Sequence, residues 1–134
     1  LPQLLKAAGD YLGILTKGNY QKILLKNDTL TLTDGYTDFP IYELSTGTKD
    51  QLIMAMRFAY LSLEANRSIC PIIIDDGWLH YDHQRKYQLA ELLAKFGEKY
   101  QIICFSSDKE MVSYYHEMNQ TVKQLEGANN EKNS

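Results

Sequence analysis

The sequence has few cysteines, no excess of positive charge and no long apolar run, and each absence excludes a class of protein. Only two cysteines occur among 134 residues, Cys70 and Cys104, and both lie in or beside apolar stretches. We therefore expect buried free thiols, as in a reducing cytoplasm, rather than a disulfide framework or a metal site. No stretch approaches the roughly 20 apolar residues of a membrane span, and the first residues lack the features of a signal peptide. The predicted location is cytoplasmic, without contact to a membrane.

The remaining composition is that of one globular domain. Hydrophobic residues make up 44% of the chain and charged residues 23%, and the formal net charge is -3. Contact with DNA would therefore need a local basic patch or parts of the protein outside this chain. Because the sequence begins with Leu rather than Met, we expect it to be a piece of a longer protein. Residues 127–134 are polar and are predicted to be a disordered tail.

Hydrophobic spacing predicts the elements of the first half. Residues 3–16 show the spacing of an amphipathic helix. An alternative interpretation is that residues 1–16 are the end of a coiled-coil helix. Two short strands over 20–26 and 29–33 flank a two-residue Asn-Asp turn and predict a hairpin. A third strand is expected within 39–44, followed by a long helix that begins at a Ser-Thr-Gly-Thr turn and is apolar almost all round.

The second half alternates strands and helices. Apolar runs at 70–74 and 100–105 predict strands buried on both faces of a parallel sheet. Helices are expected around 89–96 and from Met111 through Val122 to Leu125. The predicted fold class is therefore α/β, with a parallel sheet core, flanking helices and a β-hairpin extension.

Asp75 and Asp76 follow the first predicted parallel strand, at the edge where α/β sheets bind ligands. Two adjacent carboxylates repel each other, and a cation relieves that repulsion. Asp75 is a candidate to hold magnesium through water, and Asp76 to orient or deprotonate an attacking water. The alternative is that one aspartate merely caps the following turn.

The Ser-Thr-Gly-Thr turn, residues 45–48, precedes a helix whose free N–H groups and partial positive charge suit a phosphate. Gly47 would allow close approach, and Ser45 would add a hydroxyl donor. The alternative is an ordinary cap by Ser45 or Thr46.

Five segments in order resemble a known family. "LSTGT" with "KDQLIMAMRFA", then "PIIIDD", "LHYD" and "QIICFSSD" are similar to the C-terminal lobe of an ABC-type ATPase head of the SMC/SbcC kind, which has the P-loop NTPase fold. The resemblance is strongest to YhaN-type AAA-domain proteins, in which a similar turn and hairpin precede the signature. It covers residues 13–112, and it makes residues 1–126 the C-terminal ATPase lobe.

The resemblance implies a role for each matching residue. The signature motif, which contacts the γ-phosphate of ATP held by the opposite head, would be Leu44, Ser45, Thr46, Gly47 and Thr48. Asp75 matches the Walker B aspartate that supports Mg²⁺, and Asp76 takes the place of the catalytic glutamate. Asp82 matches the D-loop at the dimer interface, and Ser107 stands where a switch histidine is common. The implied partners are a second head, DNA and a nuclease subunit.

The sequence departs from the family pattern in four ways. Asp76 is one methylene shorter than glutamate, Ser107 cannot act as an imidazole sensor, and Thr46 replaces the first signature glycine. These three changes favour slow hydrolysis or an altered geometry. The fourth departure is the absence of any G-x-x-x-x-G-K-[ST] motif, so the isolated chain is predicted to be inactive without an N-terminal Walker A lobe.

Two alternatives remain open from the residues. His80, Asp82 and His83, together with the aspartate pair, could form a two-metal phosphohydrolase centre. Ten tyrosines could instead mark a non-catalytic interaction module. ATP-dependent pairing of heads would separate the ATPase from such a module.

Overall fold

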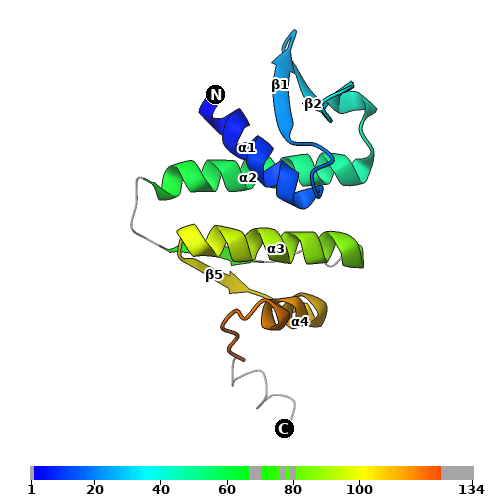
Figure 1. Cartoon of the computed structure of the whole chain (residues 1–134). Helices are drawn as coiled ribbons and strands as arrows, with labels where there is room; N and C mark the ends of the chain where they lie inside the picture. The colour runs from blue at the N-terminus through cyan, green and yellow to red at the C-terminus, as the bar shows by residue number, and fades with distance from the viewer. Residues whose placement is uncertain (1, 67–70, 76–77, 79–80, 125–134) are drawn as a thin grey trace.

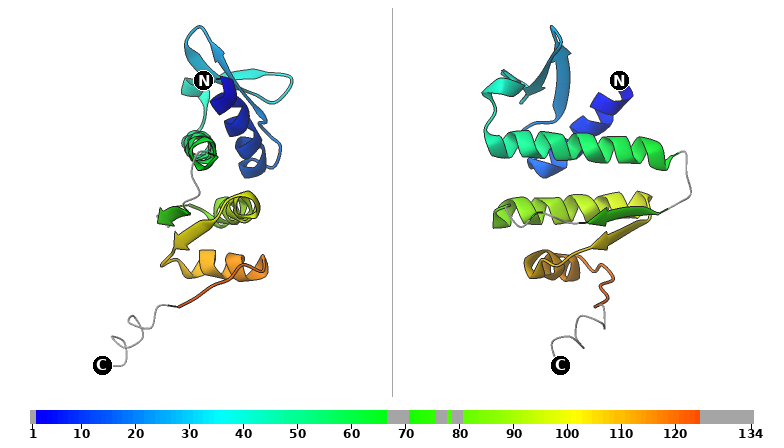
Figure 2. Two further views of the ribbon diagram at one scale, coloured as in Figure 1. Left: turned by 90° about the vertical axis from the view of Figure 1, so that its left-hand side faces the viewer. Right: turned by 180° about the vertical axis from the view of Figure 1, so that it is seen from behind.

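The computed structural model describes residues 2–66, 71–75, 78 and 81–124. The elements, in chain order, are α1 (Pro2–Leu15), β1 (Lys22–Lys26), β2 (Thr29–Thr33), β3 (Asp38–Pro40), the 3-10 helix η1 (Ile41–Glu43), α2 (Thr46–Ala65), β4 (Ile72–Asp75), α3 (His83–Lys99), β5 (Ile102–Phe105) and α4 (Lys109–Glu117). They stack in layers, with α1 and the β1–β3 sheet above α2, and with α3, the β4–β5 sheet and α4 below it (Figures 1 and 2). Within the described part of the chain, no helix has the length and apolar character needed to span a membrane.

The predicted hairpin is present. β1 and β2 pair antiparallel from Lys22 with Thr33 to Lys26 with Thr29. Asn27 and Asp28 both have positive φ, of 50° and 62°, as a two-residue turn that follows the strand twist requires. The third strand is shorter than predicted, because β3 ends at Pro40, which has no N–H to continue the ladder, and the chain turns into η1.

One core joins the upper layers to α3. The rings of Phe58 on α2 and Phe96 on α3 lie 5.1 Å apart between centroids. The side-chain amide of the buried Gln51 donates to the carbonyl oxygen of Leu15, at 2.9 Å, and to Oε1 of Gln88, at 3.2 Å. α2 is therefore packed from both sides, although Ile53 and Tyr60 remain 49% and 58% exposed.

β4 and β5 are parallel, as predicted, in a register that pairs Ile72 with Ile102 and Asp75 with Phe105. The expectation that both strands are buried on both faces is wrong for this chain. Ile73, Ile103 and Phe105 are 67%, 42% and 50% exposed, whereas the alternating residues Ile72 and Ile102 pack against the core. The reason is that α3 and α4 lie on one side of this two-stranded sheet, and the described residues leave its other face open (Figure 2).

The last helix is shorter than its apolar spacing predicts. α4 ends at Glu117, where Asn119 adopts a left-handed conformation (φ 59°) and the N–H of Gln120 bonds to the carbonyl of Tyr115. This turn is a usual way to end a helix. Val122 therefore lies in irregular chain, and Leu125 and the predicted tail lie outside the described residues.

The thiol prediction holds only in part. Cys104 carries a thiol rather than a disulfide, but it is half-buried rather than buried. Cys70 lies outside the described residues.

Candidate functional site

The Ser-Thr-Gly-Thr turn opens α2, and Ser45 caps the helix. Its hydroxyl accepts the N–H of Thr48 at 3.2 Å and donates to the Thr48 hydroxyl at 2.9 Å. Leu44 is buried and anchors the turn, whereas Ser45 and Thr46 are exposed. The cap interpretation of Ser45 is thus confirmed. The cap takes the N–H of Thr48, whereas the N–H groups of Thr46 and Gly47 before it have no intrahelical partner and remain for an anion.

Gly47 meets a positive charge from another helix. A Cβ atom placed on Gly47 would overlap the guanidinium group of Arg85, which lies in the first turn of α3. Glycine leaves room for the guanidinium group here, although the end of a flexible arginine side chain can also shift aside. The start of α2 thus carries an arginine in addition to its helix dipole. Sequence reasoning missed Arg85, because a separation of 38 positions along the chain gives no local signal of this contact.

Asp82 begins α3 and holds Arg85. Its Oδ1 accepts the N–H of Arg85 at 2.8 Å, and its Oδ2 lies 3.4 Å from the Arg85 side chain. The carboxylate is 60% exposed, so it remains accessible at this corner of the molecule. The structure thus connects the predicted D-loop residue to the predicted signature through one side chain.

The predicted strand-end residues lie at the same end of the molecule. β4 and β5 are parallel and in register, so Asp75, the last residue of β4, lies beside the Ser106–Ser107 segment that follows β5. Both strands point toward the end where α2 and α3 begin (Figures 1 and 2). Asp75 and Ser107 are exposed. Asp75 alone offers one carboxylate, which fits Mg²⁺ held mainly by water and phosphate.

The proposed catalytic residue Asp76 and the possible ligand His80 lie outside the described residues. In the part of the chain that the structure describes, no three or more His, Cys, Asp and Glu side chains gather in a way that could hold a metal. Asp82 and His83 have other partners, Arg85 and Glu110 respectively. The described geometry gives no support to the two-metal alternative.

Comparison with known proteins identifies the fold to which this arrangement belongs. No protein-family model matches the chain. A structure from work on ATP-driven dimerization and DNA-stimulated activation of SMC ATPases superposes with a TM-score of 0.66 at 17% identity, over 84% of this chain and 72% of that one. The chain has the fold of an SMC ATPase head.

Two further SMC heads agree with this fold. The Pyrococcus furiosus head with an extended coiled coil, bound to the C-terminal domain of ScpA, gives a TM-score of 0.58 at 16% identity, over 84% of this chain and 30% of that one. A head bound to the C-winged helix domain of ScpA gives 0.61 at 16% identity, over 84% and 36%.

A sequence relative supports the same resemblance. The uncharacterized protein YhaN of Bacillus subtilis (strain 168) is 32% identical over an alignment of 120 residues that covers 87% of this chain. The chain spans only 12% of the length of YhaN. The resemblance to SMC heads and to YhaN, inferred from the motifs, is confirmed.

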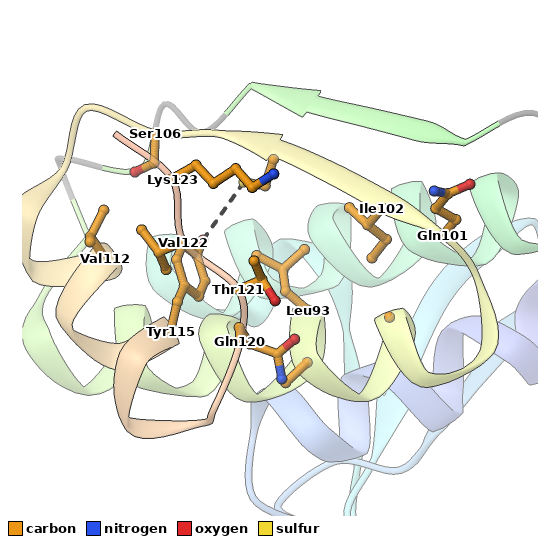
Figure 3. A pocket seen from close by; sticks show the side chains of 13 residues that line it. Leu93, Gln101, Ile102, Ser106, Val112, Tyr115, Gln120, Thr121, Val122 and Lys123 are labelled. Atoms are coloured by element: carbon orange, nitrogen blue, oxygen red, sulfur yellow. Dashed lines mark hydrogen bonds between the residues drawn. The ribbon is translucent and has the colours of Figure 1, made fainter. Parts of the chain in front are cut away.

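A cleft of about 360 Å³ lies elsewhere in this SMC head fold, between α3, β5, α4 and residues 120–123 (Figure 3). Tyr115 points into it and bonds to Cys104, with 3.8 Å between oxygen and sulfur. Ser106 is at its edge, but the signature residues, Asp75 and Asp82 do not line it. The cleft is therefore separate from the predicted nucleotide site.

Proposed function

We propose that this chain is the C-terminal part of an ATP-binding and ATP-hydrolysing SMC/SbcC-like head that dimerises on ATP. The observation that carries the proposal is the contact between Gly47 of the signature turn and Arg85 of the helix capped by Asp82. It unites two of the motifs at one corner and adds an arginine to a helix N-terminus, which together suit a phosphate.

Each residue has a role in this proposal. The signature turn, with N–H groups of α2 and the Ser45 hydroxyl, contacts the γ-phosphate of ATP bound to the opposite head. Asp75 holds Mg²⁺ through water, and Mg²⁺ supplies charge neutralisation on the phosphates. Asp76 orients the attacking water, Ser107 faces the phosphate from the switch position, and Asp82 lies across the dimer interface. ATP binding closes two heads and hydrolysis reopens them.

The Walker A lobe is the first partner, and the open sheet face supports its presence. Ile73, Ile103 and Phe105 form an apolar strip on the face that the described helices leave uncovered. Exposed apolar strips of this kind mark contact surfaces. We propose that the Walker A lobe of the same polypeptide covers this face and that the chain alone does not hydrolyse ATP.

The wider context of the proposal comes from the resemblance. It implies a role in DNA repair or chromosome maintenance, with DNA and a nuclease subunit as partners in the cytoplasm. The structural neighbours include heads studied for ATP-driven dimerization and heads bound to ScpA.

The test uses the chain joined to its Walker A lobe and two variants of the α2 cap. Ser45→Asn and Ser45→Asp both keep a side chain that caps a helix well, and they differ only in charge. We expect Ser45→Asp to weaken ATP-dependent dimerisation about tenfold or more through repulsion of the γ-phosphate, and Ser45→Asn to retain it. Sedimentation with and without Mg²⁺–ATP measures the dimer, and phosphate release measures turnover.

Two results would contradict the proposal. Equal dimerisation by both variants would make the turn an ordinary helix cap. A wild-type dimer that forms equally with and without nucleotide would favour the interaction module.

A further inference from the structure

A buried lysine follows the predicted D-loop residue and has no part in the roles assigned above. The Lys86 side chain, in the first turn of α3, is only 8% exposed. Its ammonium nitrogen lies 2.9 Å from Oδ2 of Asp108 and 3.0 Å from Oε1 of Glu110. Lysine is rarely buried unless it is paired, so these two carboxylates account for its position.

The second carboxylate extends the cluster. Oε2 of Glu110 accepts a hydrogen bond from the Tyr114 hydroxyl at 2.7 Å and pairs with Nδ1 of His83. Glu110 thus contacts α3 through Lys86 and His83, and contacts its own helix through Tyr114. We name Lys86, Asp108, Glu110, His83 and Tyr114 the α3–α4 ion cluster.

The cluster fixes the loop that carries the predicted switch position. Asp108 caps α4, because its Oδ1 accepts the N–H groups of Glu110 at 3.0 Å and Met111 at 3.4 Å. Its own N–H bonds to the Ser106 hydroxyl at 3.2 Å. Ser107 lies between Ser106 and Asp108. Ser106 is hydrogen-bonded to Asp108, and Asp108 is held by Lys86, so the position of Ser107 depends on Lys86.

The other end of the cluster belongs to the predicted D-loop. Lys86 lies one helical turn after Asp82, and its N–H bonds to the Asp82 carbonyl at 3.0 Å. A change at the start of α3 would therefore move Lys86, and with it the segment from Ser106 to Asp108. Buried ion pairs are often replaceable by apolar residues without loss of stability, which favours a role in fixing geometry.

We propose that Lys86 is a positioning residue, which holds the Ser107 loop at a fixed place relative to the α3 start that Asp82 caps. The inference rests on the proposed function, because Ser107 and Asp82 serve one ATP site only if the head hydrolyses ATP. Lys86 itself touches no nucleotide in this proposal.

The first test is amide hydrogen exchange in the 134-residue chain. Lys86→Met removes the charge and keeps the length, Lys86→Arg restores the charge, and Lys95→Met changes an exposed lysine of the same helix. We expect Lys86→Met to speed exchange of the Glu110 and Met111 amides about tenfold or more, and Lys86→Arg to reverse most of the change. Leu92→Ala, at a buried position of α3, serves as a control for general destabilisation and should act on the whole core.

The second test is ATP turnover by the chain joined to its Walker A lobe. Lys86→Met should lower kcat about tenfold with little change in KM, since geometry and not ATP affinity is altered. Lys86→Arg should recover kcat, whereas Lys95→Met and folded Leu92→Ala should match wild type.

The outcomes separate the two proposals. Unchanged amide exchange in Lys86→Met, or an unchanged kcat despite faster exchange, overturns the positioning role. A wild-type protein that neither dimerises with ATP nor hydrolyses it overturns the proposed function. Even in that case, faster amide exchange in Lys86→Met that is confined to the start of α4 supports the contact by which Lys86 holds this segment.

Discussion

The starts of α2 and α4 are built in contrasting ways. Both helices follow a loop predicted to reach the ATP site, and both begin with a short side chain that accepts N–H groups of the first turn. At α2 the capping group is the neutral and exposed Ser45 hydroxyl, beside Gly47. At α4 it is the buried Asp108 carboxylate, paired with Lys86. The first start is open to an anion from outside, whereas the second already contains an anion and its counterion.

At the α4 start, the buried anion and its counterion each favour the charged form of the other. Burial acts to raise the pKa of Asp108, but the Lys86 ammonium and the two capped N–H groups outweigh it and lower that pKa overall. Contacts with Asp108 first and with Glu110 second raise the pKa of Lys86. Both groups therefore remain charged at neutral pH.

The largest change in the free energy of unfolding should come from removing the helix caps of α4 and α2, one at a time. Asp108→Ala removes a cap and leaves the buried Lys86 with one carboxylate, so we expect a loss of about 3 kcal/mol in the free energy of unfolding. Ser45→Ala removes a cap alone and should cost about 1 kcal/mol. Urea unfolding at pH 7 measures both. Equal losses would show that the Lys86 pair adds nothing to the cap, and the contrast between the two helix starts would fail.

Acid should weaken the α4 start. Hydrogen bonds from Tyr114, His83 and Lys86 lower the pKa of Glu110 from 4.5 to about 2. Because the folded-state pKa is the lower one, the stabilisation by Glu110 is complete above about pH 4.5 and is lost as the pH falls toward 2. Wild type should therefore lose more stability than Glu110→Gln across this window, as followed by urea unfolding at several pH values. Parallel curves for the two proteins would contradict the assignment.

The contrast also shows what the sequence could predict. The hairpin, the long helix after the Ser-Thr-Gly-Thr turn and the parallel strands were predictable, because apolar periodicity and turn residues act locally. The cap at Ser45 was predictable for the same reason. The contact of Gly47 with Arg85 and the pairing of Lys86 with Asp108 were not, since each depends on how distant segments pack. The expected burial of both sheet faces was wrong because periodicity shows that a strand is apolar, and not what covers it.

The smallest effect in this chain should come from the open sheet face, where the same contrast of open and closed surfaces recurs. Ile73 is 67% exposed, whereas its neighbour Ile74 packs against the core. We expect Ile73→Ser to change the free energy of unfolding of the chain by less than about 0.5 kcal/mol, and Ile74→Ser to cost clearly more. For binding of the Walker A lobe we expect the opposite order. Ile73→Ser should weaken binding more than Ile74→Ser, because only Ile73→Ser alters the surface offered to that lobe. Pull-down of the separately produced lobe by each variant measures this. Undiminished capture by Ile73→Ser would mean that the lobe binds elsewhere, and the apolar strip of Ile73, Ile103 and Phe105 would need another occupant.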